Sequence, residues 1–166
     1  MESGKPIVSN EQLANDFRTL LQGKISNELI ESTVQSLSTQ TLAKTEAATA
    51  ASADPCPSYG ASGSVWSMVF YMGCQCTVTN GKTFNGSVWG VSFPGGGALF
   101  GDVYLNCPTC SSLDQLYSQT TNFVLTATSV YTAFYFYDKN GNYLGSFQAG
   151  SVSTVNGGGA GSGSWS

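Results

Sequence analysis

The stretch SVWGVSFPGGGALFGDVYL, residues 87–105, decides the fold because it sets three glycines between two apolar runs. A phosphate-binding P-loop requires Lys and Ser or Thr after its glycines, and a dinucleotide-binding fingerprint requires a following helix. Here Gly95, Gly96 and Gly97 are followed by ALFGDVYL, a strand-like run. We therefore predict a structural role for these glycines, namely positive φ and close backbone approach at a tight corner of a β fold.

After Tyr59 the chain alternates along its strands with the period of two that is typical of β structure. In the first run, Val65 and Ser67 fall on one face and Trp66 and Met68 on the other. Two Asn-Gly pairs, in TNGK (79–82) and KNGN (139–142), favour type I′ hairpin turns. The predicted strands span residues 65–72, 74–79, 83–92, 98–105, 121–128, 130–137, 142–149 and 151–155, with 162–165 as a last short piece.

About eight short strands with regular turn signals indicate an all-β barrel or sandwich. A closed antiparallel barrel is favoured, because closure removes strand edges that so few charged residues could not protect. Ser111 and Asp114 have the spacing of a capping box and predict one short helix. The sequence contains a weak internal repeat, since GSVWGVSFPGGGA (86–98) resembles GSVSTVNGGGA (150–160). The repeat reflects either compositional bias or two pseudo-symmetric Greek keys with equivalent glycine corners.

We expect residues 1–58 to form an N-terminal extension and linker, and residues 59–166 to form the β-barrel domain. Gly23 divides an apolar stripe of helical spacing into one bent helix or two shorter helices. This extension should be helical or partly disordered and only loosely packed on the barrel. A membrane or partner helix is the alternative, but the basic polar face expected at a membrane is missing. The stripe comprises Leu13, Phe17, Leu20, Leu21, Ile25, Leu29, Ile30, Val34 and Leu37.

Charge is scarce in this chain. The 166 residues include 10% charged side chains and carry a formal net charge of −4, which excludes the basic surface typical of nucleic-acid-binding proteins. No apolar run approaches the roughly 20 residues of a membrane-spanning helix. The N-terminus lacks a signal-peptide pattern, so we expect either a mature form or export by another route.

No catalytic constellation is evident in the sequence. The absence of histidine excludes Ser-His-Asp and Cys-His catalysis and every His-containing zinc site. Among the barrel carboxylates, Asp114 fits a helix cap, and Asp138 fits a hairpin turn because DKNGNY has its glycine too early for a calcium loop. Asp102 is the one acidic side chain without a structural assignment. We therefore expect no enzyme activity, no catalytic residues and no cofactor.

The five cysteines leave three alternatives open. Cys74 and Cys76 share one face of a strand, and with Cys107 and Cys110 of CPTC they could form a four-thiolate zinc site that leaves Cys56 over. Disulfides are the alternative for an exported protein, and free thiols for an intracellular one.

Three segments, FNGSVWGVSFPGGGALFGDVYL (84–105), AFYFYDKNGNYLGSFQAGSVSTV (133–155) and GGGAGSGSWS (157–166), resemble the virulence-associated protein family of Rhodococcus equi, of the VapA/VapB type. The resemblance covers residues 59–166 and implies a compact eight-stranded antiparallel barrel behind a variable, poorly ordered N-terminal region. It also implies a secreted protein that is associated with survival inside host phagocytes and has no known catalytic site. The five cysteines are more than the family pattern implies.

We therefore expect a non-enzymatic, secreted, virulence-associated effector, a monomer that acts in host cells, within the phagosome, by binding a host protein or a membrane surface. One alternative is a sugar-binding, lectin-like module, because exposed aromatic rings can stack on sugars, although most aromatic side chains fill cores. The other alternative is a pore-forming protein whose N-terminal segment refolds. The candidate stacking residues are Trp66, Trp89, Tyr131, Tyr135 and Tyr137.

Overall fold

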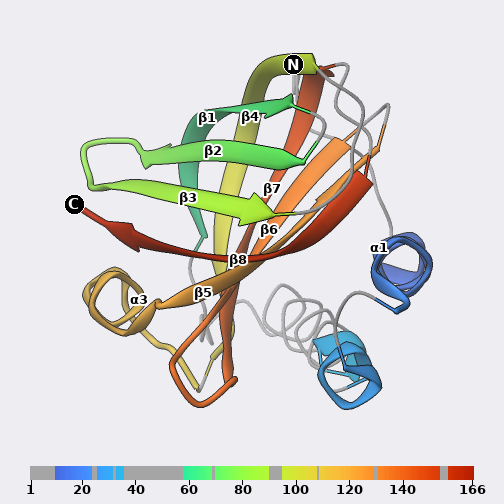
Figure 1. Ribbon diagram of the computed structural model, residues 1–166. Helices are drawn as coiled ribbons and strands as arrows, with labels where there is room; N and C mark the ends of the chain where they lie inside the picture. Colours follow the sequence, from blue (N-terminus) through green and yellow to red (C-terminus); the bar gives the residue numbers. More distant parts are fainter. Residues whose placement is uncertain are drawn as a thin grey trace.

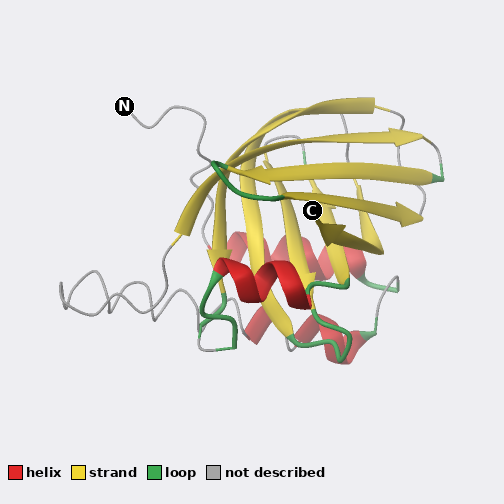
Figure 2. Ribbon diagram, turned by 90° about the vertical axis from the view of Figure 1, so that its left-hand side faces the viewer, coloured by secondary structure: helices red, strands yellow, loops and turns green. Residues whose placement is uncertain are grey.

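Eight antiparallel strands of the described chain close into a barrel, with helices along one side of it (Figures 1 and 2). The computed structural model describes residues 10–23, 26–31, 33–35, 58–68, 70–89, 95–107, 109–128, 131–153 and 157–166. The strands are β1 (Ser58–Met68), β2 (Tyr71–Val78), β3 (Thr83–Trp89), β4 (Gly95–Leu105), β5 (Asn122–Ala127), β6 (Tyr131–Tyr137), β7 (Tyr143–Ser153) and β8 (Gly157–Trp165). The helices are α1 (Asn10–Leu21) and α3 (Leu113–Gln119), and residues 27–31 and 33–35 are also helical.

The strand order β1-β2-β3-β8-β5-β6-β7-β4 contains two Greek keys. In each key the fourth strand lies beside the first, so that β4 pairs with β1 and β8 pairs with β5. The β3–β8 and β4–β7 pairs join the two keys and close the barrel. The repeated segments 86–98 and 150–160 both run from the third to the fourth strand of their key, which favours pseudo-symmetry over compositional bias. The predicted Greek-key barrel is confirmed.

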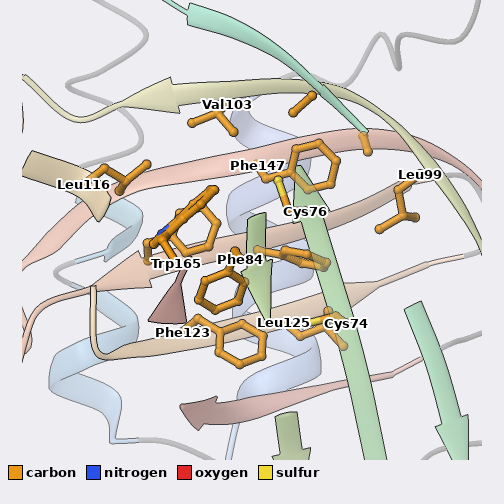
Figure 3. Packing of buried hydrophobic residues seen from close by; sticks show 14 of the residues in the cluster. Cys74, Cys76, Phe84, Leu99, Val103, Leu116, Phe123, Leu125, Phe147 and Trp165 are labelled. Carbon is orange, nitrogen blue, oxygen red and sulfur yellow. The ribbon is translucent and has the colours of Figure 1, made fainter. Parts of the chain in front are cut away.

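Inward-facing aromatic and aliphatic side chains fill the barrel (Figure 3). Phe84 lies at the centre, with its ring centroid 5.0 Å from that of Phe136, 5.1 Å from Phe123 and 5.4 Å from Trp165. Such offset and edge-to-face contacts are the favoured arrangements of aromatic rings. The barrel interior is therefore a packed core and not a channel.

A second hydrophobic cluster lies on the outside of the barrel, between β6 and the N-terminal helices. Strand alternation turns Tyr135 and Tyr137 outward, yet both are buried. The ring of Phe17 in α1 stacks edge-on against Tyr135 at 4.8 Å, and the hydroxyls of Thr33 and Tyr137 share a buried hydrogen bond of 2.6 Å. The expectation of loose packing is thus wrong for this part of the extension. Within the described residues, no helix is both long and apolar enough to cross a bilayer.

The structure corrects several predicted element boundaries. The predicted strand 65–72 is the end of β1 and the start of β2, whereas the predicted strands 142–149 and 151–155 are one strand, β7. β1 begins at Ser58, inside the segment 47–63 whose composition is typical of a linker; the rest of that linker, residues 47–57, lies outside the described residues. The division of the chain into 1–58 and 59–166 stays a prediction.

Two turns and one cap also differ from expectation. The Asn-Gly turns have one positive φ each, at Asn80 and Gly141, and a type I′ turn requires two. The cap of α3 is Ser112, whose hydroxyl accepts a hydrogen bond from the backbone N–H of Gln115, so the predicted pair Ser111 and Asp114 lies one residue too early.

Candidate interaction surface

The carboxylates of the barrel lie on three separate elements. Asp102 is buried on β4, opposite Gly60 of β1 and Gln148 of β7, while Asp114 stands in the first turn of α3. Asp138 begins the β6–β7 turn and accepts hydrogen bonds from backbone and side-chain N–H groups of Asn142 at 2.9 and 3.0 Å and from the Asn140 backbone at 2.8 Å. Its slight burial raises the pKa of Asp138, but these hydrogen bonds outweigh that effect and lower the pKa overall. This carboxylate is a turn-forming group, as the hairpin interpretation predicts.

The four described cysteines lie in different surroundings. Cys74 and Cys76 of β2 point into the barrel core, where burial raises the pKa of both thiols well above the ordinary value. Cys110 is a third free thiol, and burial raises its pKa to about 11. Cys107 is disulfide-bonded, and Cys56 lies outside the described residues. Among the described residues no three potential ligands lie close enough to hold a metal ion, so Cys74, Cys76, Cys107 and Cys110, the ligands of the zinc alternative, are not brought together there.

The three glycines of the PGGG motif begin a strand instead of forming a corner with positive φ. Gly95, Gly96 and Gly97 pair with β1, and none of them has a positive φ. The closest backbone approach in β4 lies further on, at Gly101, where a Cβ would stand 2.0 Å from the Gln148 carbonyl oxygen. Sequence reasoning missed Gly101, although a lone glycine inside a strand is a recognised signal of close approach.

Exposed apolar side chains gather at one end of the barrel. Trp66 and Met68 point outward from the end of β1, Phe70 lies in the β1–β2 turn, and Trp89 ends β3; their exposed fractions are 42%, 67%, 66% and 74%. The register places them together, because Met68 pairs with Tyr71 and Tyr71 pairs with Trp89. We call these four residues, Trp66, Met68, Phe70 and Trp89, the apolar end. Single exposed apolar residues are common, whereas a group of them side by side is a candidate interaction surface.

Local contacts hold the two tryptophan rings of the apolar end in place. The Trp66 ring covers Gly73, where a Cβ would stand 2.1 Å from the Trp66 Cζ2 atom, so the ring could keep this position only over a glycine. The Trp89 ring packs edge-on against Tyr71, with ring centroids 5.1 Å apart. These contacts arrange the surface before any partner binds, which lowers the entropic cost of binding.

A groove of about 430 Å³ is lined in part by Trp89. Leu29 of the N-terminal helical region forms one wall, and Ser87, Asn122 and Ser162 contribute hydroxyl and amide groups from β3, β5 and β8. Of the five predicted stacking residues, only Trp66 and Trp89 are exposed, while the three tyrosines are buried in the cluster beneath the N-terminal helices.

Comparisons with known proteins agree with the fold. A sequence model of the family described as Rhodococcus equi virulence-associated protein matches residues 3–166. The chain is similar to the solved structure of VapB from the intracellular pathogen Rhodococcus equi, with 35% identity and a TM-score of 0.60 over 67% of this chain and 97% of VapB. It is also similar to VapD from the same pathogen, with 34% identity and a TM-score of 0.62 over 68% of this chain and 100% of VapD. A search of curated proteins gave no match.

Proposed function

Because the chain belongs to the Rhodococcus equi virulence-associated protein family, we propose that it serves a virulence-related role as a secreted protein that binds a host membrane or a host partner and catalyses no reaction. The observation that carries the proposal is the apolar end: four large hydrophobic side chains stay in water at the end of a barrel whose core is already full. A surface of this kind favours association over chemistry.

The absence of histidine supports a non-catalytic role, since histidine is the commonest general base near neutral pH. The three carboxylates of the barrel are spread over β4, α3 and the β6–β7 turn, and Asp138 is engaged by its own turn. The host phagosome is the compartment we propose for its action.

The proposal is tested by supplying the purified full chain to cultured phagocytes that have ingested bacteria and counting surviving bacteria. We expect the chain to raise survival, and Asp102→Asn to do so equally, while esterase, glycosidase, protease and thiol-oxidase panels stay silent. No effect of the chain on survival would overturn the virulence-related role. A turnover that disappears with Asp102→Asn, together with the survival effect, would show an enzyme instead.

A neutral sugar is the second candidate ligand, and the groove beside Trp89 favours it. An exposed indole next to the hydroxyls of Ser87 and Ser162 and the amide of Asn122 combines a stacking surface with hydrogen-bonding groups. A glycan array tests this candidate: a sugar that binds the chain but not Asn122→Ala would support it, and a silent array would reject it.

A further inference from the structure

We propose that the apolar end docks on a neutral phospholipid bilayer, inserting Met68, Phe70 and the Trp89 indole into the membrane interface. This inference deepens the proposed function, rests on it, and names the partner of the apolar end. The surface is built for shallow insertion because its side chains are large, apolar and outward-pointing, and two of them are indoles, which favour the boundary between water and lipid.

The charge distribution of the barrel identifies the partner. Beyond residue 57 the sequence holds five charged side chains; none of them lies on β1, β2 or β3, and four lie at the end of the barrel opposite to the β1–β2 turn. Lys82 follows the β2–β3 turn, Asp114 stands in α3, and Asp138 and Lys139 lie in the β6–β7 turn, while Asp102 is buried on β4.

The antiparallel register fixes this polarity. The β1–β2 turn that carries Phe70 and the β2–β3 turn before Lys82 lie at opposite ends of the same strand, β2. From Ser58 to Gly101, Lys82 is the only charged residue in the sequence. The apolar end can therefore approach hydrocarbon without moving a charged barrel side chain out of water, which would be costly.

A bilayer fits this surface better than a protein or a sugar. Protein partners are steered and oriented by complementary charges around the contact, and the apolar end offers none of its own. Sugars are bound in clefts and grooves, whereas Met68 and Phe70 are about two-thirds exposed at and beside a turn. Since the three strands that carry this surface, β1, β2 and β3, hold no charged residue, the lipid it fits is zwitterionic, such as phosphatidylcholine, and its binding should be insensitive to salt.

The test measures co-sedimentation of the full chain with phosphatidylcholine vesicles, for the wild type and for two variants. The double variant Met68→Ser, Phe70→Ser removes the most exposed apolar groups of the β1–β2 turn. The control Phe100→Ser removes a large apolar side chain of similar exposure, 53%, from the outer face of β4, opposite Ser62 in the middle of β1. Because all three side chains are largely exposed, thermal unfolding should give nearly the same midpoint for the three proteins.

We expect the double variant to bind these vesicles at least about tenfold more weakly than the wild type, because two apolar side chains that the bilayer would bury are lost. Phe100→Ser should bind like the wild type, and raising NaCl to about 0.5 M should leave binding unchanged. Vesicles with brominated acyl chains supply a second measurement, which needs no variant. They should quench the fluorescence of the exposed Trp66 and Trp89 but not that of Trp165, which lies in the core.

Several outcomes would overturn the proposal: no binding to phosphatidylcholine, binding that requires anionic lipid and disappears in salt, or equal loss in Phe100→Ser. Capture of a host protein that is lost in the double variant, with vesicle binding unchanged, would make the surface a protein interface instead. The proposed function is judged separately. Vesicle binding without any effect in phagocytes rejects the function, and a phagocyte effect without vesicle binding rejects only this inference.

Discussion

Close backbone approach restricts single positions of this barrel to glycine, and Gly101 is a clear case. A Cβ on Gly101 would lie 2.0 Å from the Gln148 carbonyl oxygen and 2.7 Å from the Ala149 Cα atom, both on the paired strand β7. Neither atom can move without separating β4 from β7. The β4–β7 pair is one of the two strand pairs that join the Greek keys, so this glycine lies where the two halves of the barrel meet.

We predict that Gly101→Ala lowers the free energy of unfolding by roughly 1–3 kcal/mol through overpacking. Gly96→Ala is the matched control in the same strand, because its Cβ would meet the Val65 oxygen at 3.3 Å and its φ is not positive. That change should stay within about 1 kcal/mol. Denaturant unfolding of both variants measures the difference. An equal loss of stability in the two would contradict the claim that close backbone approach restricts position 101 to glycine.

The cysteines give a second prediction at this scale, on their covalent state. Cys107 is disulfide-bonded, whereas Cys74, Cys76 and Cys110 are free. Because only one other cysteine remains in the sequence, we predict that Cys56 is the disulfide partner of Cys107. The three free thiols are buried, and burial raises their pKa, so the native chain should resist alkylation near pH 8.

Thiol counting checks this covalent state. In denaturant without reductant, three thiols should react, and after reduction all five. Peptide mapping of the unreduced chain should recover Cys56 linked to Cys107. Five reactive thiols before reduction would contradict the disulfide, and rapid labelling of the native chain would contradict the burial of the three.

At the scale of elements, the N-terminal helices complete the outer face of β6. All seven residues of β6 are buried, which a barrel strand with one face in water would not show. Phe17 and Leu21 of α1 lie with Tyr131, Tyr135 and Tyr137 in one cluster that is separate from the barrel core. The helical region therefore stabilises the barrel from outside.

We predict that Phe17→Ala destabilises the chain by about 3 kcal/mol, because a fully buried ring that stacks on Tyr135 is lost. Its neighbour Arg18 forms an exposed ion pair with Glu31 at 3.1 Å, so Arg18→Ala should change stability far less. Equilibrium unfolding compares the two variants. A larger loss in Arg18→Ala would mean that the helix is held by charge and not by the cluster.

Much of this element structure is predictable from the sequence, and the failures have physical causes. Period-two alternation and Asn-Gly turns locate β3, β5 and β6 closely. The β1–β2 turn was missed because the run VWSMVFYM (65–72) keeps its apolar character through the turn and contains no glycine, proline or asparagine.

Two features of the barrel surface, the burial of the outer face of β6 and the exposure of the apolar end, depend on tertiary structure. The run YTAFYFY of β6 is rich in aromatic residues on both faces, a signal of double-sided burial that was available but does not say which element provides the cover. Core filling was the expectation for most aromatics, and it is confirmed for the three tyrosines, whereas the exposure of Trp66 and Trp89 follows from their outward positions at strand ends.

At the scale of the whole molecule, buried groups that must stay neutral set the pH range of stability. Burial raises the pKa of the Cys74, Cys76, Tyr137 and Tyr143 side chains in the folded chain. In the unfolded chain these groups ionise near their ordinary pKa values of 9.0 and 10.0. A raised folded pKa gives stability that is fully present below the unfolded pKa and is lost as pH rises.

We therefore predict that these groups leave the free energy of unfolding unchanged from neutral pH to about pH 8, and lower it above about pH 9 by up to about 1.4 kcal/mol per group and pH unit. Denaturant unfolding between pH 7 and pH 11 provides the curve. Stability that stays constant up to pH 11 would contradict the burial of these four groups.

The exposed apolar side chains and most of the charged side chains of the barrel lie in different places. The central claim is that the apolar end makes the contact through which the protein acts. The survival of bacteria in phagocytes that receive the purified full chain tests it most directly, through two variants compared with the wild type. Met68→Ser, Phe70→Ser should abolish the gain in survival, whereas Phe100→Ser, which changes an equally large exposed side chain on β4, should keep it. Full activity of the double variant, or equal loss in both variants, would contradict the claim.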